Sequence, residues 1–273
     1  MIARRGHQWR LGLRRIGAMM LRHFYLMRRS WPRLLDLIYW PALNVVLWGF
    51  ITIFLTGHSS WLAQTGGLLV TAVLLWDILF RGQIGLFLTF LEEVWSRNLG
   101  HLMVTPMRPI ELVASLLLAS LLRTLFAVGT ASALAIPLFG ISVYDLGLPL
   151  AGYFFNLIAF GWSMGLIVSG LVLRYGQSAE HLGWVLVFMI VPICGVYYPL
   201  EVLPPVVHWI ALAVPPSHVF EGMRAILIDH QFRLDLMINA TILNMLYLAA
   251  AIAGFLGIVR QARVHGQLLQ LGE

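Results

Sequence analysis

The stretch "LEEVWSRNLGHLMVTPMRPIEL", residues 91–112, stands between two long apolar runs. It holds six charged or titratable side chains and two prolines, although 60% of the 273 residues are hydrophobic and only 11% are charged. An ordinary soluble domain has charges on about a quarter of its residues. A short polar link between apolar runs is typical of a connection between two helices that cross a membrane.

Several apolar runs reach the roughly 20 residues that a helix needs to cross the hydrocarbon core of a bilayer. We predict an all-α polytopic membrane protein, because a β-barrel would show strict alternation over short segments. Six transmembrane helices are expected, at residues 34–56, 65–90, 109–139, 147–173, 183–198 and 237–259. The expected organisation is a cytoplasmic N-terminal helix (1–33), a six-span transmembrane domain (34–259) and a cytoplasmic tail (260–273).

Residues 1–33 contain nine of the eighteen arginines. A helical projection of residues 9–27 separates apolar side chains from arginines. The apolar stripe is Trp9, Leu13, Ile16, Met20, Phe24 and Met27, and the arginines opposite are Arg10, Arg14, Arg15 and Arg22. This pattern predicts an amphipathic helix at the membrane surface rather than a basic arm that binds nucleic acid.

The distribution of arginine predicts the orientation. The N-terminal segment, the 91–108 link and the tail are rich in arginine, whereas the links 57–64 and 140–146 contain none. Because arginine is enriched in cytoplasmic loops, both termini of this multi-pass protein are expected in the cytoplasm.

The fifth expected span, 183–198, would rise only about 24 Å, which is less than the thickness of the hydrocarbon core. It leads into "YYPLEVLPPVVHWIALAVPPSHVFEGMRAIL", residues 197–227, on the external side. Two apolar pieces, 203–214 and 217–228, are too short to span and too apolar for a free loop. We predict a re-entrant helical hairpin, with an amphipathic surface loop as the alternative.

The composition excludes several kinds of chemistry. The chain has no lysine, which excludes an ATP-binding P-loop and a Schiff base to a cofactor. Its one cysteine, Cys194, is expected to be a small buried hydrophobe and cannot form a disulfide within the chain. The nine histidines show no paired metal-ligand spacing, so no metal site is expected.

The sequence "GWSMG", residues 161–165, matches the G-x-S-x-G pattern of serine hydrolases. A nucleophile elbow requires a strand, a turn and a helix, and this motif lies in the middle of an expected span. Gly161, Gly165 and Ser169 instead predict close helix packing. An intramembrane serine hydrolase that uses Ser163 remains an alternative function.

Three charged residues lie within the expected spans, where charges are costly and usually paired or functional. Asp77 and Arg81 are four residues apart and share a helix face, and counting from the 91–108 link places Arg123 at the same depth. We predict an ion-pair network that pins two helices, with the lining of a transport route as the functional interpretation. An ion-coupled secondary transporter that uses these three residues is a second alternative, although no internal repeat is evident.

The opening stretch itself predicts a short helix over residues 92–103. Trp95, Leu99 and Leu102 would form one stripe against the spans. The opposite face, offered to the cytoplasm, would consist of Glu93, Arg97 and His101.

The two quoted stretches, in this order and behind an amphipathic N-terminal helix, resemble the membrane-spanning subunit of type-2 ATP-binding cassette (ABC) exporters. The second stretch is the more specific, with its Y-P-L-E-x-L-P and P-P-x-x-x-x-E-x-x-R patterns. The resemblance implies a permease, not an enzyme, in a bacterial inner membrane. It implies a homodimer or pseudo-dimer with two cytoplasmic ATPase subunits, which bind ATP and magnesium, and no cofactor in this chain. The implied cargo is an amphipathic or lipid-linked molecule such as a polysaccharide, a lipo-oligosaccharide or a drug.

The resemblance also implies roles for the two polar segments. The link between the second and third spans would be the coupling helix, for which we expect Glu93, Arg97 and His101 to contact the ATPase. The hairpin would be an external gate. The gate residues identified in this way are Pro199, Leu200, Glu201, Leu203, Pro204, Trp209, Pro216, Glu221 and Arg224.

Overall fold

The computed structural model describes residues 2–58 and 66–264, and the regular structure in these ranges is entirely helical. Five of the helices are long and apolar enough to cross a membrane. They are α2 (Trp31–His58), α4 (Gly66–Trp95), α6 (Pro109–Phe139), α7 (Pro149–Tyr175) and α11 (Leu234–Val264). The prediction of an α-helical, multi-pass membrane protein is confirmed.

The remaining elements are short, apart from the first helix. They are α1 (Ile2–Arg29), α5 (Leu99–Val104), η1 (Val143–Leu146), η2 (Gln177–Glu180), α8 (His181–Ile193), η3 (Leu200–Val202), α9 (Pro205–Leu212) and α10 (Pro215–Asp229). Helix α1 confirms the helix expected at residues 9–27, and α9 and α10 correspond to the two expected pieces of the hairpin.

The expected fifth span is shorter than the prediction of 183–198. Helix α8 has 13 residues, which rise only about 20 Å. It ends because Pro192 lies in its last turn and Gly195 then adopts a left-handed conformation with φ of 60°. The described chain therefore has five helices of spanning length and one short apolar helix, rather than six full spans.

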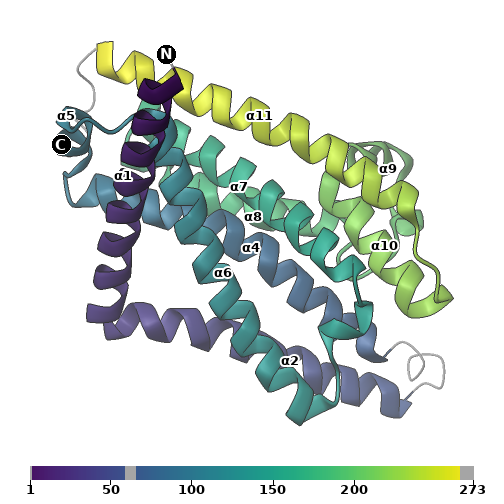
Figure 1. Ribbon diagram of the computed structural model, residues 1–273. Coiled ribbons are helices and arrows are strands. Elements are labelled where there is room, and N and C mark those ends of the chain that lie inside the picture. Colours follow the sequence, from purple (N-terminus) through teal and green to yellow (C-terminus); the bar gives the residue numbers. More distant parts are fainter. Residues whose placement is uncertain (1, 59–65, 265–273) are drawn as a thin grey trace.

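Helix α4 is the centre of the bundle. Of its most apolar stretch 83% is buried, against 22% for the corresponding stretch of α11. Figure 1 shows α7 and α8 between α4 and α11, and α2 on the opposite side of α4. Helix α6 packs on both α2 and α4. The least apolar of the five long helices, α4, is therefore the most buried, and the most apolar, α11, is the least buried.

The crossing of α4 and α7 depends on glycine. A Cβ atom at Gly161 would lie 2.6 Å from the carbonyl oxygen of Leu79, and one at Gly165 would lie 2.9 Å from that of Gln83. Both distances are too short for any side chain, so these two positions let the backbones of α4 and α7 touch. The predicted packing role of "GWSMG" is confirmed.

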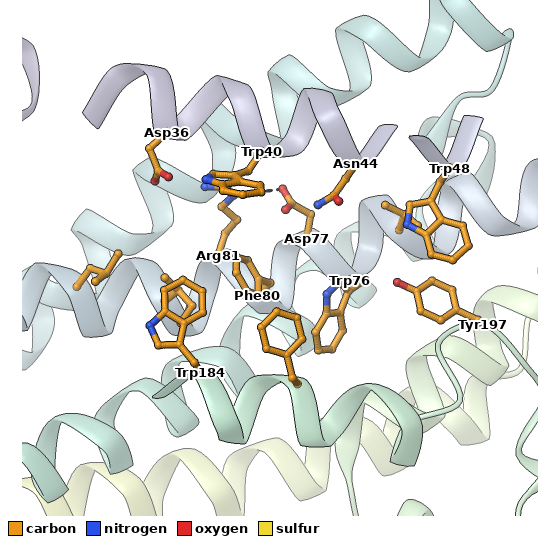
Figure 2. Close-up of a pocket in the computed structure, with 14 residues that line it drawn as sticks. Asp36, Trp40, Asn44, Trp48, Trp76, Asp77, Phe80, Arg81, Trp184 and Tyr197 are labelled. Atoms are coloured by element: carbon orange, nitrogen blue, oxygen red, sulfur yellow. Dashed lines mark hydrogen bonds and ion pairs between the residues drawn. The ribbon is translucent and has the colours of Figure 1, made fainter. Parts of the chain in front are cut away.

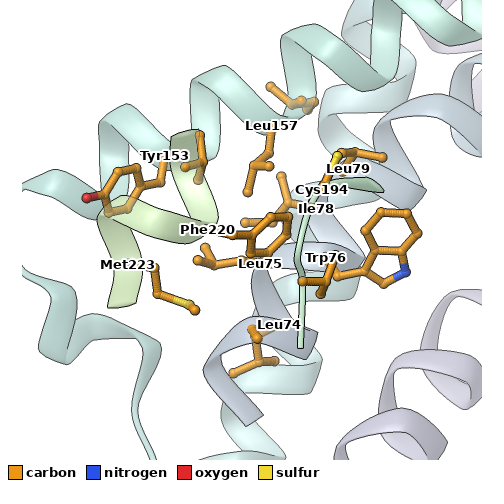
Figure 3. Close-up of a cluster of buried hydrophobic side chains, with 14 of the residues drawn as sticks. Leu74, Leu75, Trp76, Ile78, Leu79, Tyr153, Leu157, Cys194, Phe220 and Met223 are labelled. Atoms are coloured by element: carbon orange, nitrogen blue, oxygen red, sulfur yellow. The ribbon is translucent and has the colours of Figure 1, made fainter. Parts of the chain in front are cut away.

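Helix α10 is part of the hydrophobic core. Figure 3 shows Phe220 of α10 pointing between α4 and α7, close to Leu75 and Leu157. Phe220 and Met223 are fully buried, as is Cys194. The second half of the expected hairpin is therefore embedded among the spans.

Helix α1 packs on α6 and α2 and lies at one end of the long helices, whereas α9 and α10 lie at the opposite end of the bundle (Figure 1). Met19 and His23 are buried beneath α1, and Leu13 and Phe24 are more than half exposed. Leu13 and Phe24 of the predicted apolar stripe therefore face outward, whereas Arg15 and Arg22 contact the rest of the protein.

Candidate functional site

The connection between α4 and α6 does not form the single helix predicted for residues 92–103. Helix α4 continues to Trp95, Arg97 has a positive φ of 52°, and α5 begins at Leu99. The turn is held by the amide N–H of Asn98, which donates to the carbonyl oxygen of Glu93 at 3.0 Å. The predicted inner and outer faces of this segment assumed one continuous helix through Arg97. Because the helix is interrupted there, part of that assignment was wrong.

Glu93 is the clearest correction, because it does not face the cytoplasm. Its side chain is 1% exposed. Nη1 of Arg22 lies 2.7 Å from each of its carboxylate oxygens, and Nδ2 of Asn98 donates to Oε2 at 2.7 Å. Arg97 and His101 are exposed, as expected. Glu93 therefore belongs to the interior of this junction, and the outer surface is formed around Arg97 and His101.

Further ion pairs join the N-terminal region to the same connection. Nη1 of Arg15 on α1 lies 3.2 Å from Oε2 of Glu111, and it also donates to the carbonyl oxygen of Pro106. Arg33, at the start of α2, lies 3.5 Å from Glu92. The helix α1 and the start of α2 thus hold both ends of the α4–α6 connection. Sequence reasoning missed these pairs; the only signal was an excess of arginine in α1 near a link with three glutamates.

His23 lies at the centre of this junction. It is buried, and neither ring nitrogen has a hydrogen-bond partner among the described residues. Burial lowers the pKa of His23 to about 4; the nearby Glu93 opposes this shift, and Arg123, Arg22 and Arg33 add to it. The imidazole is therefore neutral at physiological pH.

Arg123 does not join Asp77 and Arg81. Its Nη2 lies 3.7 Å from Oε2 of Glu92, near the end of α4. The predicted depth counted only backbone positions, but an arginine side chain reaches several ångströms along its helix toward the polar end of a span. Asp77 and Arg81 therefore pair with each other, and Arg123 pairs with Glu92 instead.

Asp77 and Arg81 do form the expected pair on α4, with Nε of Arg81 3.4 Å from Oδ2 of Asp77. The pair lines a cavity of about 460 Å³ between α2, α4 and α8 (Figure 2). The other residues around this cavity are Asp36, Trp40, Asn44, Trp48, Val73, Trp76, Phe80, Ile84, Leu88, Trp184, Phe188 and Tyr197.

The walls of the cavity are largely aromatic. The rings of Trp48 and Tyr197 stack with centroids 4.6 Å apart. The ring centroid of Phe80 lies 6.1 Å from that of Trp184 and 6.1 Å from that of Phe188. Sequence reasoning found Asp77 and Arg81 but not these rings. The signal was present, because Trp40, Asn44 and Trp48 are spaced by four and so share one face of α2.

The external segment is tied together by two charged residues of α10. Oε1 of Glu221 accepts from the amide N–H of Leu200 at 2.8 Å and from Nη2 of Arg224 at 2.9 Å. Arg224 is buried and also donates to the carbonyl oxygen of Gly195 at 2.6 Å. These bonds fix α10 against the chain that follows α8.

The other expected gate residues differ in burial. Leu200 and Pro216 are buried, and Leu203 is partly buried. Exposed positions are Pro199, Glu201, Pro204 and Trp209. Trp209 is 73% exposed, so α9 presents an apolar surface that none of the other described residues covers.

Ser163 has the environment of a packing residue. It is fully buried, and its hydroxyl donates to the carbonyl oxygen of Ala159 at 2.8 Å, one turn earlier in α7. A serine that donates to its own helix backbone is satisfied without a base. The hydrolase alternative therefore receives no support from this geometry.

Comparison with known proteins gives the family. The family model for ABC-2 type transporters matches residues 14–228, which is most of the chain. A comparison with curated proteins gave no match. The matched region includes α2 to α10 and therefore the α4–α6 connection, the aromatic cavity and the external segment. The chain belongs to the ABC-2 type transporter family and is an ABC transporter permease.

Proposed function

We propose that the chain is the permease subunit of an ATP-driven exporter, working as a homodimer or pseudo-dimer with two cytoplasmic ATPase subunits in a bacterial inner membrane. The ATPase subunits supply the ATP and magnesium site, and this chain supplies the route for an amphipathic or lipid-linked molecule. Family membership implies ABC ATPase partners, and the absence of lysine agrees with an ATP site in another chain.

One observation carries this proposal: the α4–α6 connection is anchored on its inner side and exposed on its outer side. Glu93 and Glu111 fix it to α1, while Arg97 and His101 remain exposed. A force applied to a segment held in this way is transmitted to α4 and α6, because the segment cannot move independently of them. We assign contact with the ATPase to Arg97 and His101, and a positioning role to Glu93.

The external segment completes the proposed route. The buried α10 and the exposed α9 would form a re-entrant hairpin in the outer leaflet, with Glu221 and Arg224 holding it closed against Gly195 and Leu200. The exposed surface around Trp209 would then meet the second permease of the dimer at the external end of the route.

The test is the charge reversal Arg97→Glu in the permease purified together with its ATPase and reconstituted in vesicles. We expect a folded permease that no longer couples ATP hydrolysis to export. The matched control is Arg174→Glu, which reverses an exposed arginine at the end of α7, outside the α4–α6 connection. Export that remains ATP-driven in Arg97→Glu, or export that is lost equally in both variants, contradicts the coupling role.

A further inference from the structure

The ion pair in the aromatic cavity is incompletely satisfied. Asp77 is 4% exposed and Arg81 is 7% exposed. The single hydrogen bond between them is 3.4 Å long, and Nη2 of Arg81 has no hydrogen-bond partner among the described residues. A guanidinium has five N–H donors and a carboxylate accepts about four hydrogen bonds. A pair that served only to pin helices would be expected to use more of this capacity, because unpaired buried charge is costly.

A third polar group, the amide of Asn44, lies next to this pair at the cavity. Figure 2 shows Asp77 and Arg81 rising from α4 toward α2, where Asn44 lies beside Asp77 and the ring of Trp40 lies above the pair. An amide both donates and accepts. The cavity therefore presents a guanidinium, a carboxylate and an amide side by side, surrounded by flat aromatic faces.

The volume is suited to a small molecule or to one part of a larger one. A cavity of about 460 Å³ falls in the range of about 300–1,000 Å³ that small-molecule sites occupy. Trp40, Trp184 and Phe188 combine cavity contact with substantial exposure. These rings lie at the rim, so the site can be reached from outside the chain.

The chemistry of the lining discriminates between the cargo classes. An alkyl chain would leave the remaining donors of the guanidinium and acceptors of the carboxylate without hydrogen-bond partners in an apolar site. A cation would pair with Asp77 but would repel Arg81, and an anion would do the reverse. A sugar ring has C–H groups on its faces, which suit aromatic rings, and hydroxyls at its edge, which both donate and accept.

We propose that this cavity binds a neutral glycosyl group of the exported molecule, with Asn44, Asp77 and Arg81 bonded to ring hydroxyls and Trp40 against the ring face. This inference rests on the proposed function and narrows its substrate to a glycan or glycolipid. No covalent step is involved, and the cavity acts only by recognition.

The test uses the full-length permease in nanodiscs and four probes that share one short alkyl tail: hexyl β-glucoside, hexyltrimethylammonium, hexyl sulfate and hexanol. Binding is measured by calorimetric titration. We expect the glucoside to bind most tightly, because it alone satisfies both members of the ion pair. Tighter binding of the ammonium, the sulfate or hexanol overturns the inference.

Variants locate the site. Asn44→Leu and Trp40→Leu change partly exposed side chains of α2 and should each weaken glucoside binding about tenfold. Phe126→Leu, which changes an exposed ring of α6 outside the cavity lining, is the matched control and should bind normally. The test does not use Asp77→Asn, because loss of this buried charge can prevent folding and would then say nothing about binding. Glucoside binding that is unchanged in both α2 variants overturns the inference.

This outcome is separate from that of the coupling test. If Arg97→Glu loses coupling but the permease binds the ammonium or the sulfate most tightly, the proposed exporter function is supported and only the glycan proposal is rejected. Conversely, coupling that persists in Arg97→Glu would contradict the proposed coupling role while leaving the binding result intact.

Discussion

Glu93 is the residue on which the α4–α6 junction depends most. It binds Arg22, which lies 71 residues earlier in the chain, and it also accepts from Asn98 in the following turn. One buried carboxylate therefore fixes both the position of α1 and the turn that leads into α5. Such a charge is stable only while its partners remain, because removing one partner leaves the other charge buried and unpaired.

We predict that Glu93→Gln lowers the stability of the permease by about 1–2 kcal/mol, since Arg22, whose side chain is 34% exposed, loses its counter-ion. Adding Arg22→Gln should recover part of the loss, because no uncompensated charge then remains. Thermal unfolding in nanodiscs measures both effects, with the exposed Glu201→Gln as a control. Equal stability of the single variant and the wild type would show that the pair is not structural.

His23 gives the junction a defined pH dependence. Its pKa is about 4 in the folded protein against an ordinary 6.5, so the unfolded chain binds a proton more readily. Stability is therefore fully present above pH 6.5 and is lost as the pH falls toward 4. At pH 5.5 the expected loss is about 1 kcal/mol.

We predict that α1 becomes more sensitive to proteolysis between pH 7.5 and 5.5, and that His23→Phe removes most of this change. The charged groups around the imidazole are Glu93, Arg22, Arg33 and Arg123. A pH response that persists unchanged in His23→Phe would assign it to another group.

At the scale of one residue, only the ion pair within one helix was predicted correctly, and the predicted contact of Arg123 with that pair was wrong. Asp77 and Arg81 could be recognised because a spacing of four places them on one face. The partners of Glu93 and Arg123 could not, because each comes from a helix distant in sequence. The same limit applied to the aromatic cavity, whose rings come from α2, α4, α8 and the segment after α8.

At the scale of one element, boundaries were predictable where the chain carries strong local signals. The third span was expected at 109–139 and α6 has those bounds. Pro109 opens it, the carboxylate of Glu111 accepts from the amide of Arg108 at 2.9 Å, and Gly140 ends it with φ of 65°. The 92–103 segment lacked such signals, and the turn at Arg97 depends on tertiary contacts of Glu93.

The packing of α7 on α4 provides a sharp test at this scale. We predict that Gly161→Ala destabilises the permease by about 1–3 kcal/mol, because its Cβ would lie 2.6 Å from a backbone oxygen that cannot move aside. Gly129→Ala is the matched control, since a Cβ there meets no atom within 4 Å on the exposed side of α6. Thermal unfolding should separate the two variants, and equal stability would show that α4 and α7 adjust freely.

At the scale of the whole molecule, the two candidate sites lie at opposite ends of the bundle. The junction of α1 and the α4–α6 connection occupies one end, and α9 and α10 occupy the other (Figure 1). Helix α4 links the junction to the aromatic cavity, because it ends in Glu92 and Glu93 and also carries Asp77 and Arg81 in the cavity. A displacement of the junction would therefore act on the cavity through α4 itself.

The orientation of this axis is the last prediction. The end with α1 and α5 carries most of the arginines, which predicts that it faces the cytoplasm. Cysteines are introduced one at a time in a Cys194→Ala background, which removes the one native, buried thiol. The positions are Ser96, in the exposed turn after α4, and Tyr144 and Val206, which are exposed near the opposite end. A membrane-impermeant maleimide should label Tyr144→Cys and Val206→Cys in intact spheroplasts, and Ser96→Cys only after the membrane is permeabilised. Labelling of Ser96→Cys from outside would show that the orientation is the reverse of the predicted one. The exposed α4–α6 connection could then not contact a cytoplasmic ATPase.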